Sequence, residues 1–419
     1  MRGVARWVTR EPGLALVVLA VLLATALYAP TLGRGIVNYE DAWLYEQNFV
    51  VQNASADSLY AIFFDLDVAS PTRWTLAPEY LPIRDLSVML DFAIWGDRYP
   101  GFHLTNLILY VLAIVLVFMM LDGFGIDRKI AGLAILLWAI HPSHAESVAW
   151  LSERKGLLGV MFAGLAGLGY TRFRAGRSAA WLGLAMLATV AAVWSKAPAA
   201  FTIAALAGLE VICPERRRSW RRSLVGLGAI ALVGGLAFIP VLILASRAAV
   251  VGESAVHAGR LAAVLGVHGF YLQLGAMAVP NAISYPLASA GPNAIQIALG
   301  TIGLAGVVSV FALKIRDARA PKELRAAAAI WVFGWLPVSH LILPLHMLTV
   351  ADRYALVLTL GFALAIATAV VRIASPKIRV TVAVAIVVFA SVRTFDAQSQ
   401  WATSLALWQR AVESDPDNG

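Results

Sequence analysis

Long apolar segments recur along the whole chain, and they constrain its fold more than any other feature. Sixty per cent of the 419 residues are hydrophobic and 14% are charged. Together with a mean hydropathy of +0.76, this excludes an ordinary soluble domain and indicates a polytopic membrane protein. Segments that we expect to cross a bilayer as helices cover residues 13–30, 104–121, 129–141, 156–171, 179–195, 197–213, 223–245, 293–313, 326–343, 354–371 and 380–396.

The basic residues predict how these segments are oriented. Of the 33 Lys and Arg residues, 21 lie in six short connections, and such residues collect on the cytoplasmic side of a membrane. This distribution favours topology signals over a nucleic-acid surface, so we expect no nucleic-acid partner. The N-terminus is then cytoplasmic and the C-terminus lies outside. The six connections are 1–11, 122–129, 171–178, 214–222, 314–325 and 372–379.

One further apolar segment, 261–279, does not fit this alternation. If it crossed the membrane, the basic connection 314–325 would lie outside. We therefore predict a re-entrant or interfacial helix there, which protein can cover at membrane depth. The predicted fold is an all-α membrane bundle of about eleven transmembrane helices plus this partial helix. A simple bundle of twelve spans is the alternative.

A long acidic loop, 31–100, separates the first two spans. It holds four Arg against ten Asp and Glu, which fits the outer side, and we expect amphipathic helices within it. The adjacent carboxylates Glu40 and Asp41 stand near its start. Such a pair suits a general base or a metal ligand at the membrane surface. A solvated turn is the alternative interpretation.

The run 141–155 concentrates ionisable residues between two apolar segments. It contains two histidines, two glutamates, an arginine and a lysine. Because ionisable groups near membrane depth are costly, the run is a functional-site hypothesis. The alternative is structural: the basic residues snorkel at span ends, Asp85 neutralises Arg84, and Asp352 pairs with Arg353. A Zn or Mn site on His141, His144 and Glu146 is disfavoured, because Pro142 disturbs the helical spacing of the first ligand.

These motifs follow a fixed order along the chain. The acidic pair and Asn48 come first, then Pro82-Ile83-Arg84, Gly101-x-His103-x-x-Asn106, the run 141–155, Trp194-Ser195-Lys196, Ile283-Ser284-Tyr285-Pro286 and Asp352-Arg353-Tyr354. This order resembles the transmembrane-and-tetratricopeptide-repeat O-mannosyltransferase family and its bacterial relatives. That family belongs to the GT-C superfamily of polyprenyl-phosphate-sugar-dependent glycosyltransferases. The resemblance covers residues 30–419, and its most specific part is the run 141–155.

The resemblance implies a membrane glycosyltransferase with its site on the outer face of a bacterial cytoplasmic membrane. The donor would be a sugar, with mannose the best-known one, on a polyprenyl phosphate held in the bilayer. The acceptor would be a hydroxyl on a protein Ser or Thr or on a glycan. Many relatives have two aspartates where this chain has Glu40 and Asp41, so which of the two is the catalytic base stays open.

The other candidate residues would bind the donor phosphate or sugar. Cations stabilise a departing lipid phosphate. We expect His141 and His144 to hydrogen-bond the phosphate or the sugar, and Glu146 to orient one of these histidines. We expect no cofactor, and we disfavour a divalent metal. The candidates are Arg84, His103, Asn106, His141, His144, Glu146, Arg154, Lys155, Lys196, Asp352, Arg353 and Tyr354.

The chain divides at about residue 396. Residues 1–396 form the predicted GT-C-like transmembrane domain, and 397–419 form an outer tail that resembles the start of a tetratricopeptide-like region. That tail supports a second hypothesis, a non-catalytic membrane assembly protein that recruits partners through it. A transporter is a third and weaker hypothesis, because no inverted repeat or matched pair of broken helices is visible.

Overall fold

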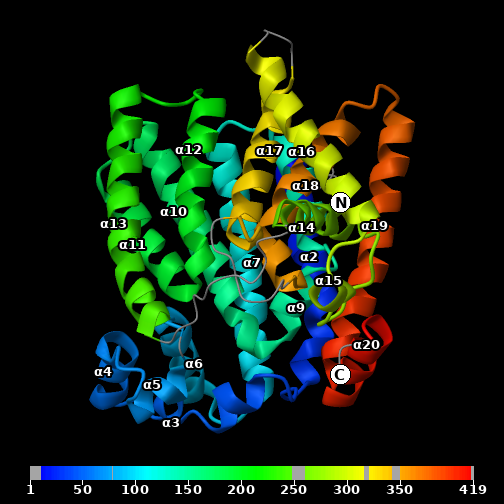
Figure 1. The fold of residues 1–419 in the computed structure, drawn as a ribbon. Helices are drawn as coiled ribbons and strands as arrows, with labels where there is room; N and C mark the ends of the chain where they lie inside the picture. The colour runs from blue at the N-terminus through cyan, green and yellow to red at the C-terminus, as the bar shows by residue number, and fades with distance from the viewer. Residues whose placement is uncertain (1–10, 78, 248–259, 316–319, 342–349, 417–419) are drawn as a thin grey trace, which may run out of the picture.

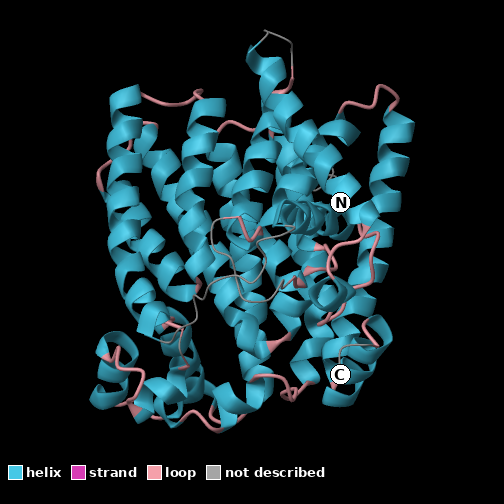
Figure 2. Ribbon diagram, in the orientation of Figure 1, coloured by secondary structure: helices cyan, strands magenta, loops and turns pink. Residues whose placement is uncertain are grey.

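The computed structural model describes residues 11–77, 79–247, 260–315, 320–341 and 350–416. Within these ranges every regular element is a helix (Figure 2). The longer α-helices are α2 (Pro12–Tyr28), α6 (Pro82–Trp95), α7 (Tyr99–Gly123), α8 (Arg128–Ala139), α10 (Arg154–Arg174), α11 (Ala180–Ser195), α12 (Thr202–Ile212), α13 (Trp220–Arg247), α14 (Arg260–Gly275), α16 (Ala294–Ile315), α17 (Lys322–Trp335), α18 (Ala355–Val371), α19 (Pro376–Ser399) and α20 (Ser404–Ser414).

Short helical segments connect them. The short α-helices are α3 (Phe49–Gln52), α4 (Ala56–Phe64), α5 (Pro71–Leu76), α9 (His144–Ala149) and α15 (Pro286–Ala290). Single helical turns are η1 (Ala29–Gly33), η2 (Ala42–Glu46), η3 (Leu151–Glu153), η4 (Ala197–Phe201), η5 (Leu336–Val338), η6 (Asp352–Tyr354) and η7 (Gln400–Ala402).

Seven helical segments in the described part of the chain are long and apolar enough to cross a membrane. Each apolar range of the sequence contains a helix, so the all-α polytopic architecture is confirmed. The number of crossings stays a prediction, because α8, α12 and α17 are shorter than a full span. The same holds for the segment 261–279, where α14 forms a helix of 16 residues.

The bundle has a packed interior and an apolar periphery. The helices α2, α7, α8, α10 and α18 share one continuous cluster of buried side chains. The helices α13 and α19 stand at opposite sides of the bundle (Figure 1). On α19, Val384 and Val392 are exposed, as are Leu232 and Leu236 on α13. Large exposed apolar side chains on both flanking helices fit a surface that faces lipid.

The long loop after the first span folds into the short helices α3, α4 and α5 and the helix α6, which gather at one end of the bundle (Figure 1). Local signals start two of these helices, because the side chains of Asn48 and Ser55 accept hydrogen bonds from backbone N–H groups of the first turns of α3 and α4. Buried side chains that include Leu44, Ile62 and Val88 hold the loop together. The helix α20 lies at the same end, which we call the loop end.

The helices α14 and α16 approach each other through two glycines. A Cβ atom on Gly300 would overlap the carbonyl oxygen of Leu265, and one on Gly269 would overlap that of Gln296. Small residues allow such close packing between membrane helices, where dispersion contacts rather than water exclusion hold the helices together.

We therefore predict that Gly300→Ala destabilises the protein by about 1–3 kcal/mol, the usual cost of overpacking a well-packed contact. Thermal unfolding of the purified protein in detergent measures this. The matched control is Gly306→Ala on the same helix, where no atom lies within 4 Å of the added methyl group. Equal stabilities of the two variants would contradict the close approach.

Candidate functional site

The turn at residues 37–41 holds the adjacent acidic residues Glu40 and Asp41 in different surroundings. The Asp41 carboxylate is buried and accepts three hydrogen bonds: from the Val37 N–H at 3.1 Å, and from the Ser152 N–H and hydroxyl at 3.0 and 2.6 Å. Glu40 is exposed, and its side chain makes no hydrogen bond or ion pair within the described residues. Asp41 thus anchors the turn to η3, which leads into α10, while Glu40 is presented to solvent.

Tyr39 shows what surrounds this turn. Burial raises the pKa of its hydroxyl; the Arg353 guanidinium lowers that pKa, and the carboxylates of Glu146 and Glu40 raise it. The Tyr39 ring also lies 4.8 Å from that of Trp150. The first-loop turn therefore stands beside residues from α9 and from η6, the turn before α18, which are distant in the sequence.

A buried ion pair joins those two elements. The Arg353 guanidinium lies 2.5 Å from one Glu146 oxygen, and the Arg353 backbone N–H donates to the other at 2.7 Å. The guanidinium also stands over the rings of Trp150 and Tyr354, at 5.6 and 5.0 Å. Glu146 was expected to orient a histidine and instead binds Arg353. The alternative pairing of Asp352 with Arg353 is wrong, because the Asp352 carboxylate accepts from Asn281 and Tyr285.

Two lysines also form ion pairs with glutamates. The Lys196 ammonium pairs with Glu153, and the Lys155 ammonium lies 2.8 Å from Glu79. The three cations remain partly accessible, with 18%, 16% and 13% of the side chains of Arg353, Lys196 and Lys155 exposed. Each therefore keeps donors for a ligand. We call Glu40, Lys155, Lys196, Arg353 and Tyr354 the loop-end site.

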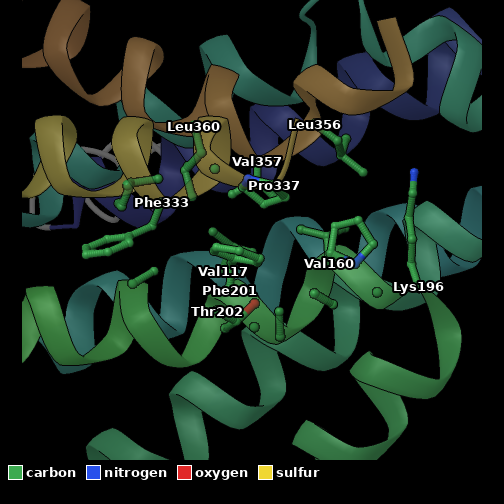
Figure 3. A pocket seen from close by; sticks show the side chains of 18 of the residues that line it. Val117, Val160, Lys196, Phe201, Thr202, Phe333, Pro337, Leu356, Val357 and Leu360 are labelled. Carbon is green, nitrogen blue, oxygen red and sulfur yellow. The ribbon is translucent and has the colours of Figure 1, made fainter. Parts of the chain in front are cut away.

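An apolar groove begins at this site. It encloses about 1020 Å³, part of it open to solvent, and runs between α10 and α12 on one side and α17 and α18 on the other. Figure 3 shows Lys196 at one end of the groove and Phe333 at the other, with Val160, Val357 and Leu360 between them. Arg353 and Tyr354 also line it. The groove is thus apolar along its length and cationic at one end.

Four other candidate residues are buried and bind other residues of this chain: Arg84, His103, Asn106 and Arg154. Arg154 is fully buried, pairs with Asp91 at 2.5 Å and donates to Asn106 at 2.8 Å. Arg84 pairs with Asp85 at 2.6 Å, which confirms that neutralising contact. His103 contacts the Gly35 carbonyl at 3.3 Å and so links α7 to the first loop. The first-loop helices are fixed to the bundle by these contacts.

The remaining candidates are also buried and hydrogen-bonded. His144 lies between the Tyr110 hydroxyl at 2.7 Å and the Thr359 hydroxyl at 2.8 Å. His141 contacts Ser143 and the Gly275 carbonyl. Within the described residues, no three His, Cys, Asp or Glu side chains cluster as metal ligands. The expectation that the protein needs no metal stays a prediction, as does a direct role for the buried residues.

Sequence reasoning missed several parts of the site. Ser152, which holds Asp41, lies inside the run 141–155 but carries no distinctive signal. Asp91 and Glu79 stand in the long loop, far in sequence from the cations that they neutralise. No sequence pattern predicts the groove, because the apolar side chains that line it are of the same types as those of every other span.

Comparisons with known proteins found relatives by sequence and by fold. No family model matches the chain. It is 32% identical over 203 residues to Protein O-mannosyl-transferase Tmtc1 of Drosophila melanogaster, which covers 47% of this chain and 23% of the fly protein. It is 30% identical over 116 residues to Protein O-mannosyl-transferase TMTC3 of Homo sapiens, covering 27% and 13% of the two chains. The sequence resembles the O-mannosyltransferase family.

The fold has a solved counterpart. The apo oligosaccharyltransferase of Archaeoglobus fulgidus matches with a TM-score of 0.51 and 15% identity, over 95% of this chain and 57% of that one. At this identity the likeness concerns the fold alone. The chain has a GT-C-like fold. It spans less than a quarter of the length of the O-mannosyltransferases that it matches.

The anchored carboxyl of Asp41 gives a pH-dependent stability. Burial raises its pKa from 3.8 to about 6, although the hydrogen bonds from Ser152 and Val37 oppose the shift. The folded protein therefore keeps this proton at pH values where the unfolded chain has released it. Ionisation of Asp41 then lowers the free energy of unfolding as the pH rises from about 4 to about 6.

We predict that Asp41→Asn removes this contribution. Relative to the wild type, the variant should gain about 2–3 kcal/mol of stability as the pH rises over that range. Unfolding at pH 4, 5, 6 and 7 in one detergent measures the difference, in which titrations common to both proteins cancel. Stability curves that stay parallel across the range would contradict the raised pKa.

Proposed function

We propose that the protein is a membrane glycosyltransferase that moves a sugar from a polyprenyl phosphate to a hydroxyl acceptor. The observation that carries this proposal is the apolar groove that ends at Lys196 and Arg353, beside the first-loop turn that presents Glu40. The likeness to O-mannosyltransferases and the GT-C-like fold support it. We place the reaction on the face that the basic connections predict to be extracytoplasmic.

The groove fits the donor's two chemical parts. Its apolar walls take a prenyl chain, which otherwise lies among lipid tails, and its cationic end takes the phosphate. Arg353 offers a planar fork of donors, while Lys196 offers a compact charge. The buried carboxylates of Glu146 and Glu153 hold both cations in place, so they need little reorganisation as negative charge develops on the leaving phosphate.

Glu40 then acts as the general base. Its carboxylate takes the proton of the acceptor hydroxyl while the acceptor oxygen forms a bond to the anomeric carbon of the sugar. The bond between that carbon and the phosphate oxygen breaks, and the polyprenyl phosphate leaves with its electron pair. Asp41 has a different role, since its oxygens already accept three hydrogen bonds. By analogy with its relatives, we propose mannose as the sugar and protein Ser or Thr as the acceptor.

Binding of the lipid phosphate tests the groove. We predict that the double variant Arg353→Met with Glu146→Gln, which leaves no buried unpaired carboxylate, weakens binding of undecaprenyl phosphate by about 10- to 100-fold, the value of a charge-assisted hydrogen bond of about 1.5–3 kcal/mol. For Lys196, the double variant Lys196→Met with Glu153→Gln avoids leaving a buried unpaired carboxylate. Binding is followed by the thermal shift of the detergent-purified protein.

The matched control is Lys377→Met, an exposed lysine at the first turn of α19, far from the groove. It should bind undecaprenyl phosphate as the wild type does. Unchanged affinity in both groove variants, in folded protein, would contradict a phosphate site at Lys196 and Arg353.

The assignment of the base is tested by transfer itself. We predict that Glu40→Gln lowers kcat by about 10²- to 10⁴-fold, the usual contribution of a general base, with unchanged stability because the side chain is exposed. Transfer is measured from a labelled polyprenyl-phosphate hexose to a Ser- or Thr-containing peptide. Full activity of Glu40→Gln would refute its role, and no transfer by the wild type to peptide or glycan acceptors would favour the assembly-protein hypothesis.

A further inference from the structure

The C-terminal tail, which we define as residues 398–416, packs against the first-loop turn. Figure 1 shows α20 at the loop end of the bundle, beside the start of the long loop. Two hydrogen bonds connect them: the Asn38 N–H donates to the Ser404 hydroxyl at 2.9 Å, and the Trp408 indole N–H donates to the Asn38 carbonyl at 3.1 Å. Both backbone polar groups of one residue, two positions before Glu40, are thus held by one helix.

Apolar contacts reinforce this attachment. Val37, Trp150, Trp401 and Leu407 belong to one buried cluster. The rings of Trp150 and Trp401 stack at 5.4 Å with 16° between their planes. The Tyr39 ring packs against three of the surrounding indoles, including that of Trp408 at 6.0 Å. The tail therefore supplies part of the wall behind the turn, on the side where Trp150 contacts Arg353.

The tail is itself well fixed to the bundle. It continues directly from α19, and the Gln398 carbonyl accepts a hydrogen bond from the Arg34 guanidinium at 2.7 Å. The Thr403 side chain caps α20 by accepting from the Ala406 N–H at 3.2 Å. On its inner face α20 buries Leu407 and Ala411. The helix α20, which is attached to the bundle, thus contacts a turn that is not part of a long helix.

We propose that the C-terminal tail positions Glu40 for the reaction, with Ser404 and Trp408 as positioning residues. This inference rests on the proposed function of Glu40. The turn has two anchors, one on each side of that residue: Asn38 binds α20, and Asp41 binds Ser152 of η3. Glu40 has no side-chain partner of its own in the described residues, so its place depends on the backbone between these anchors. Removing one anchor frees the carboxylate to move while the cationic groove stays intact.

The test compares kinetics and binding in the full chain. The double variant Ser404→Ala with Trp408→Phe removes both hydrogen bonds and keeps an aromatic ring in the wall. We expect a fall in kcat of about 10- to 100-fold, the effect of a displacement of about 1 Å. KM for the polyprenyl-phosphate hexose and the affinity for undecaprenyl phosphate should not change. Ser404→Thr with native Trp408 keeps a hydroxyl and should retain activity.

The control variant is Val412→Ala, an exposed residue on the same helix. It should behave as the wild type in every measurement. An unchanged kcat in the double variant would overturn the proposal. So would an equal loss of kcat and phosphate affinity at a lowered unfolding temperature, because that pattern reports general destabilisation.

Hydrogen exchange separates this proposal from the proposed function. The amide of Tyr39 donates to the Val37 carbonyl at 2.9 Å, so its exchange rate reports the order of the turn. In the double variant, amides of residues 37–40 should exchange at least about tenfold faster, whereas those of α10 should not change. Unchanged exchange overturns the positioning role even if the wild type transfers sugar. Faster exchange in the double variant, together with no sugar transfer by the wild type, would support the attachment of the turn by the tail and would refute only the proposed reaction.

Discussion

The ion pair between Glu146 and Arg353 organises the loop end of this protein. It joins the short helix α9 to η6, the turn before α18, and both Glu146 oxygens contact Arg353, one at the guanidinium and one at the backbone N–H. Burying a charged pair is costly unless its geometry and hydrogen bonds are good, as they are here. The pair fixes a guanidinium that remains accessible at the mouth of the groove. Trp150, the first-loop turn and the C-terminal tail then pack around it.

The same design recurs in the surrounding charges. Arg353 and Lys196 are accessible at the groove while a buried carboxylate holds each of them, Glu146 for Arg353 and Glu153 for Lys196. Lys155 differs, because its partner Glu79 is exposed. A preformed set of donors stabilises developing negative charge without having to reorganise. The acidic residues follow a similar division, since Asp41 is used up by its hydrogen bonds and Glu40 is left to meet a ligand. A residue with a structural contact and a residue accessible to a ligand can thus be neighbours in the sequence, as Asp41 and Glu40 are.

Sequence patterns predicted the architecture because bilayer physics leaves few choices. The lengths of the apolar segments located a helix in every expected range, including 261–279. The Arg84–Asp85 contact was also foreseeable, because the two residues are adjacent. Which ionisable residues face the groove was not. Arg154 and Lys155 are neighbours in sequence, yet one is fully buried on Asp91 and the other is accessible beside Glu79. Consecutive side chains of a helix point in different directions. Which of the two is buried therefore depends on the segments that pack against each side of the helix.

The most direct test of this account is to locate the lipid by photocrosslinking. A polyprenyl phosphate with a photoreactive prenyl chain would be irradiated with the protein in detergent, and the labelled peptides identified by mass spectrometry. The account predicts adducts on the groove-lining residues of α10, α12, α17 and α18, which excess unlabelled polyprenyl phosphate suppresses. Adducts confined to the exposed faces of α13 and α19, and insensitive to that competitor, would contradict a donor site in the groove.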